Sequence, residues 1–290
     1  MTFEEFLIRV KSAVDKNLAD GTSLQYKSIL KNNEVAVTGA YFSRGPEEAG
    51  SRLIYMEPLY GLMKGTDDID AAAELLLREK ESPVPERYRR IRADCFEEIR
   101  GQLILRLVGK ERNKNRLPGL VYREFLDMAA CVCILFQSEE EERGLTEVSR
   151  KMADSWGIPD EELLDTALKN TEILLPDTLR TLREAAALPE GEDGVDDCYV
   201  LSNEACYLGA AAVLYTGKIA GIAEKYDSDL YLIPSSIHEM ILVPANSMDE
   251  NFLREAIRSV NENEVPPEDI LTESLYLYRR ENGRIDRVPD

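Results

Sequence analysis

Residues 230–243 read LYLIPSSIHEMILV, and this stretch decides the fold of the C-terminal third of the chain. Two runs of strand-forming residues, 230–233 and 239–243, flank a short segment with the composition of a turn. Proline cannot donate a hydrogen bond to a β-ladder, so Pro234 is expected to end the first strand. The stretch is therefore predicted to be a β-hairpin.

Further elements are predicted on both sides of this hairpin. Helices are expected at 217–226 and 250–261, and strands at 198–202, 206–214 and 274–279. From residue 206 the order is then β-α-β-β-α-β, which is the ferredoxin-like order. We expect an α+β fold with mixed or antiparallel sheets and flanking helices, whose C-terminal part is a candidate for the ferredoxin-like arrangement.

The first two hundred residues are predicted to alternate in the same way between helices and strands. An amphipathic helix follows Thr2, and a hairpin at 26–42 turns at Asn32 and Asn33. One long or bent strand is expected within 120–136, and a helix after Pro176. Composition divides the chain into an α+β domain at 1–137, an acidic helical segment and linker at 138–197, and a second α+β domain at 198–290.

Composition limits the class of protein. The chain has 290 residues, 35 Lys and Arg against 55 Asp and Glu, and a net charge of −20, which makes direct nucleic-acid binding an unfavourable hypothesis. The longest apolar run, 128–136, is too short for a membrane helix, and no signal peptide is apparent, so no membrane association is expected. Five sparse cysteines fit a reducing compartment, and a cytoplasmic location is expected.

Motifs for metals, cofactors and nucleophiles are incomplete. His238 is the single histidine, so the start of a zinc-protease motif at His238-Glu239 lacks its second histidine. Cys131 and Cys133 lack the C-x₂-C spacing of structural zinc sites, and buried thiols are the expected interpretation. No glycine-rich phosphate loop is complete. We therefore expect no metal and no cofactor.

A weak catalytic constellation remains in the hairpin turn. Its candidates are Ser235, Ser236, His238 and Glu239, with His238 as a general base. The alternative is that His238 is a structural residue that hydrogen-bonds backbone, and the sequence favours this alternative.

Basic residues are concentrated in one segment. Residues 86–124 contain eleven Lys or Arg and six Asp or Glu, including Arg87, Arg89, Arg90 and Arg92. These four arginines could bind an anion or an acidic partner. The large acid excess elsewhere favours pairing of these arginines with the protein's own carboxylates.

Several segments together resemble a known family. They are the Lys31-Asn32-Asn33 hairpin, Ile54 to Glu57, Phe125 to Ala129, Trp156 to Leu163 with Asn170-Thr171 and Leu174-Leu175-Pro176, Leu232 to Glu239, Val260-Asn261 and Tyr276. Their order and spacing are similar to a domain-of-unknown-function family of bacterial proteins that is common in intestinal clostridial anaerobes. The resemblance implies a bacterial cytoplasmic protein with an α+β fold, and no catalytic residue can be transferred because the family has no assigned activity. Pro159 departs from the Ser or Thr cap expected there.

Three functions are compatible with these observations. A non-enzymatic cytoplasmic binding or regulatory protein is favoured, because every catalytic motif is incomplete. An enzyme with an unrecognised site around His238 is the first alternative. An acidic protein that mimics nucleic acid on a partner's basic surface is the second, motivated by the charge of −20. A protein partner is compatible with all three.

Overall fold

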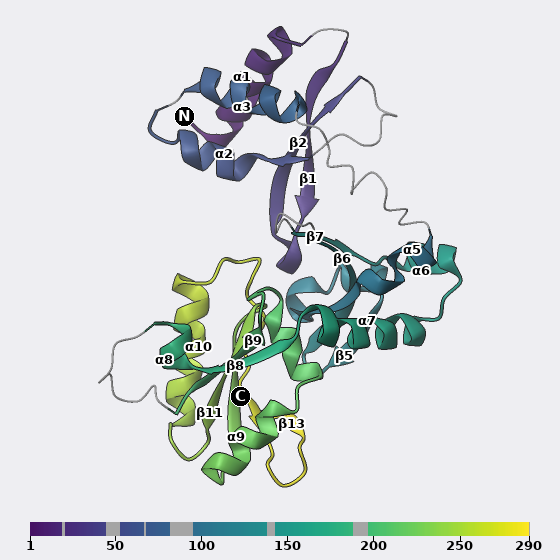
Figure 1. Cartoon of the computed structure of the whole chain (residues 1–290). Coiled ribbons are helices and arrows are strands. Elements are labelled where there is room, and N and C mark those ends of the chain that lie inside the picture. Colours follow the sequence, from purple (N-terminus) through teal and green to yellow (C-terminus); the bar gives the residue numbers. More distant parts are fainter. Residues whose placement is uncertain are drawn as a thin grey trace. The chain divides into compact units, whose positions relative to one another are not determined.

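The computed structural model describes residues 1–18, 21–44, 53–66, 68–81, 95–137, 143–187 and 197–289. Helices and three antiparallel sheets make up the described chain, which confirms the α+β class (Figure 1). The chain folds as two compact units, Met1–Arg90 and Ile91–Asp290. The boundary between these units differs from the boundaries at 137 and 197 that composition suggests. The division of the chain into three segments remains a prediction.

The described part of the first unit contains three α-helices and one small sheet. Helix α1 (Phe3–Lys16) begins at Thr2, whose hydroxyl accepts from the Glu5 N–H while the Glu5 carboxylate accepts from the Thr2 N–H. The other elements are α2 (Met56–Met63), α3 (Ile69–Glu81) and the sheet β1 (Ser23–Leu30), β2 (Ala36–Ser43) and β3 (Ile54–Tyr55). Apolar side chains from α1, α2, α3 and the sheet form one core.

The first hairpin is confirmed, but its turn is shifted by one residue. Strands β1 and β2 pair from Ser23 with Ser43 to Leu30 with Ala36. Positive φ angles occur at Asn33 and Glu34 rather than at Asn32 and Asn33. The turn is longer than a two-residue loop because Lys31 N–H donates to the Val35 carbonyl.

The N-terminal part of the second unit contains a four-stranded sheet. Strand β6 (Met128–Gln137) lies between β4 (Leu103–Gly109) on one side and, on the other, β5 (Tyr122–Phe125) and β7 (Arg143–Glu147), which pair with its successive halves. The single strand expected within 120–136 is therefore wrong. Leu126 has a φ of 57° and reverses the chain between β5 and β6. The turn consists of Leu126 and Asp127 and contains neither glycine nor proline, so no standard turn signal marks the reversal.

Helix α7 (Asp160–Leu174) covers one face of this sheet, next to α5 (Phe96–Ile99) and α6 (Arg150–Trp156) (Figure 1). The buried Thr171 hydroxyl accepts from the Leu105 N–H at 2.8 Å and donates to the Ala167 carbonyl. Ser149 caps α6, and Gly157 ends it with a φ of 66°. Pro159 occupies the cap position of α7 without a side-chain hydrogen bond.

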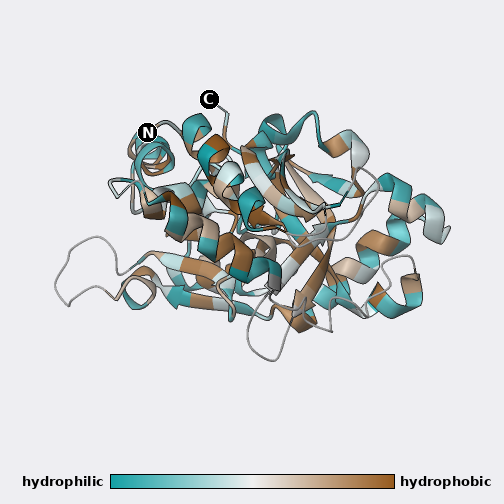
Figure 2. Cartoon of the chain, turned by 90° about the horizontal axis from the view of Figure 1, so that it is seen from above, coloured by the Kyte–Doolittle hydropathy of each residue, from teal (hydrophilic) through white to brown (hydrophobic). Residues whose placement is uncertain are grey.

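The six-stranded sheet has the order β13-β12-β10-β11-β9-β8. Its strands are β8 (Asp177–Thr181), β9 (Tyr199–Asn203), β10 (Leu230–Ser236), β11 (Glu239–Pro244), β12 (Tyr276–Tyr278) and β13 (Ile285–Arg287). The helices in this part are α8 (Leu182–Ala185), α9 (Lys218–Tyr226) and α10 (Glu250–Asn263). Figure 2 shows helices banded by hydrophilic and hydrophobic residues, as expected where one face packs on a core.

The ferredoxin-like expectation is half right. The order β9-α9-β10-β11-α10-β12 is present, and β11 lies between β9 and β10 as in a split βαβ unit. In the ferredoxin-like fold the last strand would pair with the first. Here β12 pairs with β10, while β8 occupies the place beside β9.

Three local predictions in this sheet are wrong. Residues 206–214 contain no strand, because Gly209–Leu214 form a 3-10 helix. Pro176 is followed by strand β8 rather than by a helix. Pro234 does not end β10: it pairs with Met240, and a bulge lets the strand continue to Ser236. No helix among the described residues combines the length and the hydrophobicity needed to cross a bilayer.

Candidate functional site

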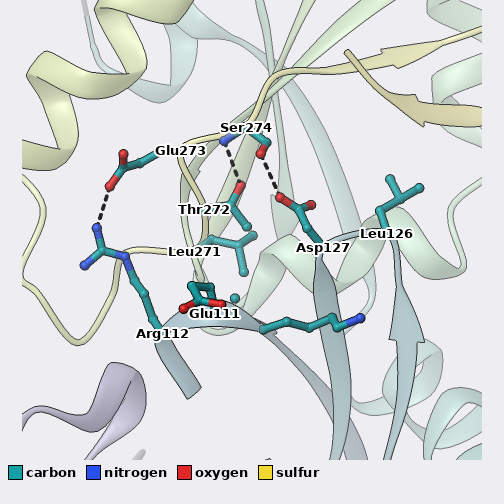
Figure 3. A pocket seen from close by; sticks show the side chains of 10 residues that line it. Glu111, Arg112, Leu126, Asp127, Leu271, Thr272, Glu273 and Ser274 are labelled. Carbon is teal, nitrogen blue, oxygen red and sulfur yellow. Dashed lines mark hydrogen bonds and ion pairs between the residues drawn. The ribbon is translucent and has the colours of Figure 1, made fainter. Parts of the chain in front are cut away.

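A cavity of about 620 Å³ lies in the second unit between the four-stranded sheet and the segment that precedes β12 (Figure 3). Its walls are Gly109 to Arg112 after β4, Leu126 and Asp127 between β5 and β6, and Leu271 to Ser274. The volume is in the range of sites for small organic ligands. None of these residues was a candidate in the sequence, since the wall segments are far apart along the chain.

A close backbone approach forms one end of this pocket. A side chain at Gly109 would collide with the carbonyl oxygen of Leu271, so only glycine fits here. The next N–H, that of Lys110, donates to the Asp127 carbonyl at 3.0 Å. Three distant segments are thereby held together at one place.

Asp127 organises the wall beside the pocket. Its Oδ2 accepts from the Ser274 hydroxyl at 2.7 Å (Figure 3). Its Oδ1 accepts from the Tyr276 hydroxyl at 2.6 Å. Arg287 Nε lies 3.7 Å from Oδ2. Burial and the hydrogen bond to this carboxylate raise the pKa of Tyr276 far above its ordinary value. Both carboxylate oxygens accept hydrogen bonds, so Asp127 holds Ser274 and Tyr276 in place beside the pocket.

The mouth of the pocket carries charges of both signs. Arg112 pairs with Glu273 at 2.5 Å, with 40% and 54% of their side chains exposed (Figure 3). Lys110 pairs with Glu124 at 2.8 Å. Exposed ion pairs contribute little to stability, so a ligand can separate them at small cost. Leu126 and Leu271 add apolar surface beside these charges.

The histidine of the hairpin turn lies elsewhere in the second unit and contacts backbone. His238 Nδ1 accepts from the Leu208 N–H at 3.1 Å. Its Nε2 lies 3.6 Å from Asp269 Oδ1, and its carbonyl accepts from the Ser202 hydroxyl. The lone pair that a general base would use therefore points at a backbone donor in this structure.

The two serines of the turn have other partners. Ser235 donates its hydroxyl to Glu239 Oε1 at 3.0 Å. The Ser236 hydroxyl accepts from the His238 backbone N–H at 3.0 Å. The four candidates are thus close together, but these hydrogen bonds do not form a chain from serine to imidazole to carboxylate.

Of the remaining predicted groups, the cysteines lie among the described residues. Cys131, Cys133 and Cys198 are buried thiols, Cys95 is half-buried and Cys206 is exposed. Burial raises the pKa of Cys131 to about 12. Arg87, Arg89, Arg90 and Arg92 lie outside the described residues. No group of three or more metal-binding side chains occurs in the described part of the chain.

The sequence comparison gives a family without an assigned activity. A model of a family of unknown function, DUF5688, matches residues 3–280. Neither the curated proteins nor the solved structures include a significant match to the chain.

Proposed function

The chain belongs to DUF5688, a family of unknown function, and we propose that this member is a non-enzymatic binding protein of the bacterial cytoplasm whose ligand is a small zwitterion. The observation that carries the proposal is the pocket beside Arg112 and Glu273, which presents both signs of charge at one mouth. A regulatory role would follow from ligand binding at this site.

The charges favour a zwitterion over a simple ion. A pure anion at Arg112 would lie next to the carboxylates of Glu273 and Glu111, which would repel it. A pure cation would meet Lys110 and Arg112. A ligand with one group of each sign replaces the Arg112–Glu273 pair by two new pairs and avoids both repulsions.

The cavity also sets the size and shape of the ligand. A volume of about 620 Å³ exceeds that of a single small amino acid and accommodates a short peptide. Leu126 and Leu271 provide apolar contacts for its side chains. The proposed class is therefore an amino-acid-like zwitterion of the size of a dipeptide with apolar side chains.

The direct test measures the melting temperature with and without leucyl-leucine. Binding should raise it by about 3–5 °C at roughly ten times the Kd. The N-acetylated and the amidated dipeptides, which carry one charge each, should have little effect. Arg112→Gln and Glu273→Gln should both abolish the response.

Arg123→Gln is the matched control. Arg123 is an exposed arginine on β5 that pairs with Glu161 and does not line the pocket, so its loss should leave the response intact. Absence of a response to any zwitterion in a panel of amino acids and dipeptides would overturn the proposal. Mass spectrometry of the incubated dipeptide should show it unchanged, and cleavage would contradict the non-enzymatic role.

A further inference from the structure

In the described part of the basic segment, residues 95–124, five basic side chains form close pairs with the protein's own carboxylates. Its described pairs are Lys110 with Glu124, Arg112 with Glu273, Lys114 with Glu111, Arg116 with Glu147, and Arg123 with Glu161 and Asp165. Arg106, on the central part of β4, differs from these five in having only a longer ionic contact.

The side chain of Arg106 is mostly buried, and its guanidinium makes no hydrogen bond among the described residues. Only 12% of its side chain is exposed, and Nε is fully buried with no acceptor. Its single ionic contact joins NH1 to Glu147 Oε1 at 3.6 Å, which is longer than a hydrogen bond. A guanidinium carries five N–H donors, and burying them unsatisfied is costly.

Glu147 makes its closer ion pair with another arginine and lies beyond hydrogen-bond distance of Arg106. Its Oε2 makes a close ion pair with Arg116 NH2, and Arg116 NH1 also donates to Asn113 Oδ1 at 2.9 Å. Two guanidinium groups therefore share one carboxylate. The three side chains have a net charge of +1 and are each at least four-fifths buried.

Among the described residues, the strand next to Arg106 places thiols rather than a second carboxylate on this face of the sheet. Arg106 is the register partner of Cys131 on β6, and Glu147 is the partner of Cys133, so these side chains share one face of the sheet. Burial raises the pKa of the Cys131 thiol to about 12 and that of Cys133 well above its ordinary value. Both thiols are neutral at physiological pH.

We propose that Arg106, together with Arg116, forms a binding site for the oxyanion group of a small molecule. A carboxylate or a phosphate presents two oxygens to the planar guanidinium fork and would complete its hydrogen bonds. It would also neutralise the excess charge beside Glu147. The exposed 12% of the Arg106 side chain gives such a group access. This site does not depend on the pocket at Arg112 and shares no lining residue with it.

The test compares melting temperatures in phosphate, in acetate and in chloride of the same ionic strength. At roughly ten times its Kd, the bound anion should raise the melting temperature by about 3–5 °C over chloride. A response to phosphate alone identifies a phosphate-type ligand, and a response to acetate alone identifies a carboxylate; either supports the site.

Substitutions identify the residues that are needed for the change in melting temperature. Arg106→Met should abolish the response to the anion while keeping the melting temperature in chloride, because an unsatisfied buried charge is removed. Arg106→Lys keeps the charge without the fork and should raise the apparent Kd at least about tenfold. Arg123→Met and Arg112→Gln should respond as the wild type does. A wild type that responds to neither anion, or an Arg106→Met variant that still responds, would overturn the site.

Discussion

Tyr276 donates its hydroxyl to the carboxylate of Asp127 at 2.6 Å, although 149 residues separate them in the chain. Tyr276 belongs to β12 of the six-stranded sheet, and Asp127 to the turn between β5 and β6 of the four-stranded sheet. The bond connects the two sheets of the second unit beside the pocket. Its tyrosine ring is fully buried.

Tyr276→Phe should therefore destabilise the protein. The substitution leaves one oxygen of a charged carboxylate without its donor, so the free energy of unfolding should fall by about 1–3 kcal/mol. Urea unfolding followed by circular dichroism measures the change. Tyr278→Phe, on the same strand, is the control, because no hydrogen bond of its hydroxyl occurs among the described residues. Equal effects of the two substitutions would show that the hydrogen bond to Asp127 does not account for the loss of stability.

His238→Ala should cost stability and leave ligand binding unchanged. The Leu208 N–H loses its acceptor, and we expect the free energy of unfolding to drop by about 1–3 kcal/mol. Leu208 has a positive φ of 56°, so the bond also holds a strained backbone residue. Thermal melting and dipeptide titration give the two readouts. An unchanged melting temperature together with loss of one defined partner in a pull-down would instead make the turn the functional site.

The thiols should differ widely in reactivity. Cys206 is exposed and should react first with a thiol reagent in the native protein. Cys131, Cys133 and Cys198 are buried, and burial raises their pKa values, so they should react only after unfolding. Alkylation in denaturant without reductant, followed by mass measurement, should modify all five cysteines. Fewer than five would indicate a disulfide.

Stability should decline in alkaline solution. Burial raises the pKa of Cys131 to about 12 and that of Cys198 to about 11, from an ordinary value of 9.0. Above about pH 9 the unfolded thiols lose protons that the folded thiols keep, so the unfolded state is favoured by up to about 1.4 kcal/mol per pH unit and thiol. This loss continues until pH passes the folded pKa.

The free energy of unfolding, measured in urea between about pH 8 and 10.5, tests this decline. Cys131→Ala should flatten the dependence above about pH 9, because one of the shifted groups is gone. Cys206→Ala is the matched control, and its curve should keep the wild-type slope. A slope that is unaffected by Cys131→Ala would assign the decline to other groups.

The sequence by itself determined the local elements whose signals are complete within a few residues. The capping box of Thr2 and Glu5 begins α1, Gly157 ends α6, and two apolar runs around residue 236 form the hairpin of β10 and β11. Short-range hydrogen bonds and backbone sterics decide such features, and these are set by neighbouring residues. The α+β class and the incomplete zinc motif at His238 followed from the same kind of reasoning.

Only the tertiary structure decided the strand pairing, the pocket and the exposed or buried state of each charge. The apolar residues 206–214 suit a strand as well as a 3-10 helix, and the close packing of Gly209 against the His238 carbonyl selects the latter. The pocket depends on the approach of Gly109 to Leu271, and the proposed anion site depends on the burial of Arg106 beside Glu147. These relationships join residues far apart in the chain, and their energies come from packing and desolvation that no local pattern records.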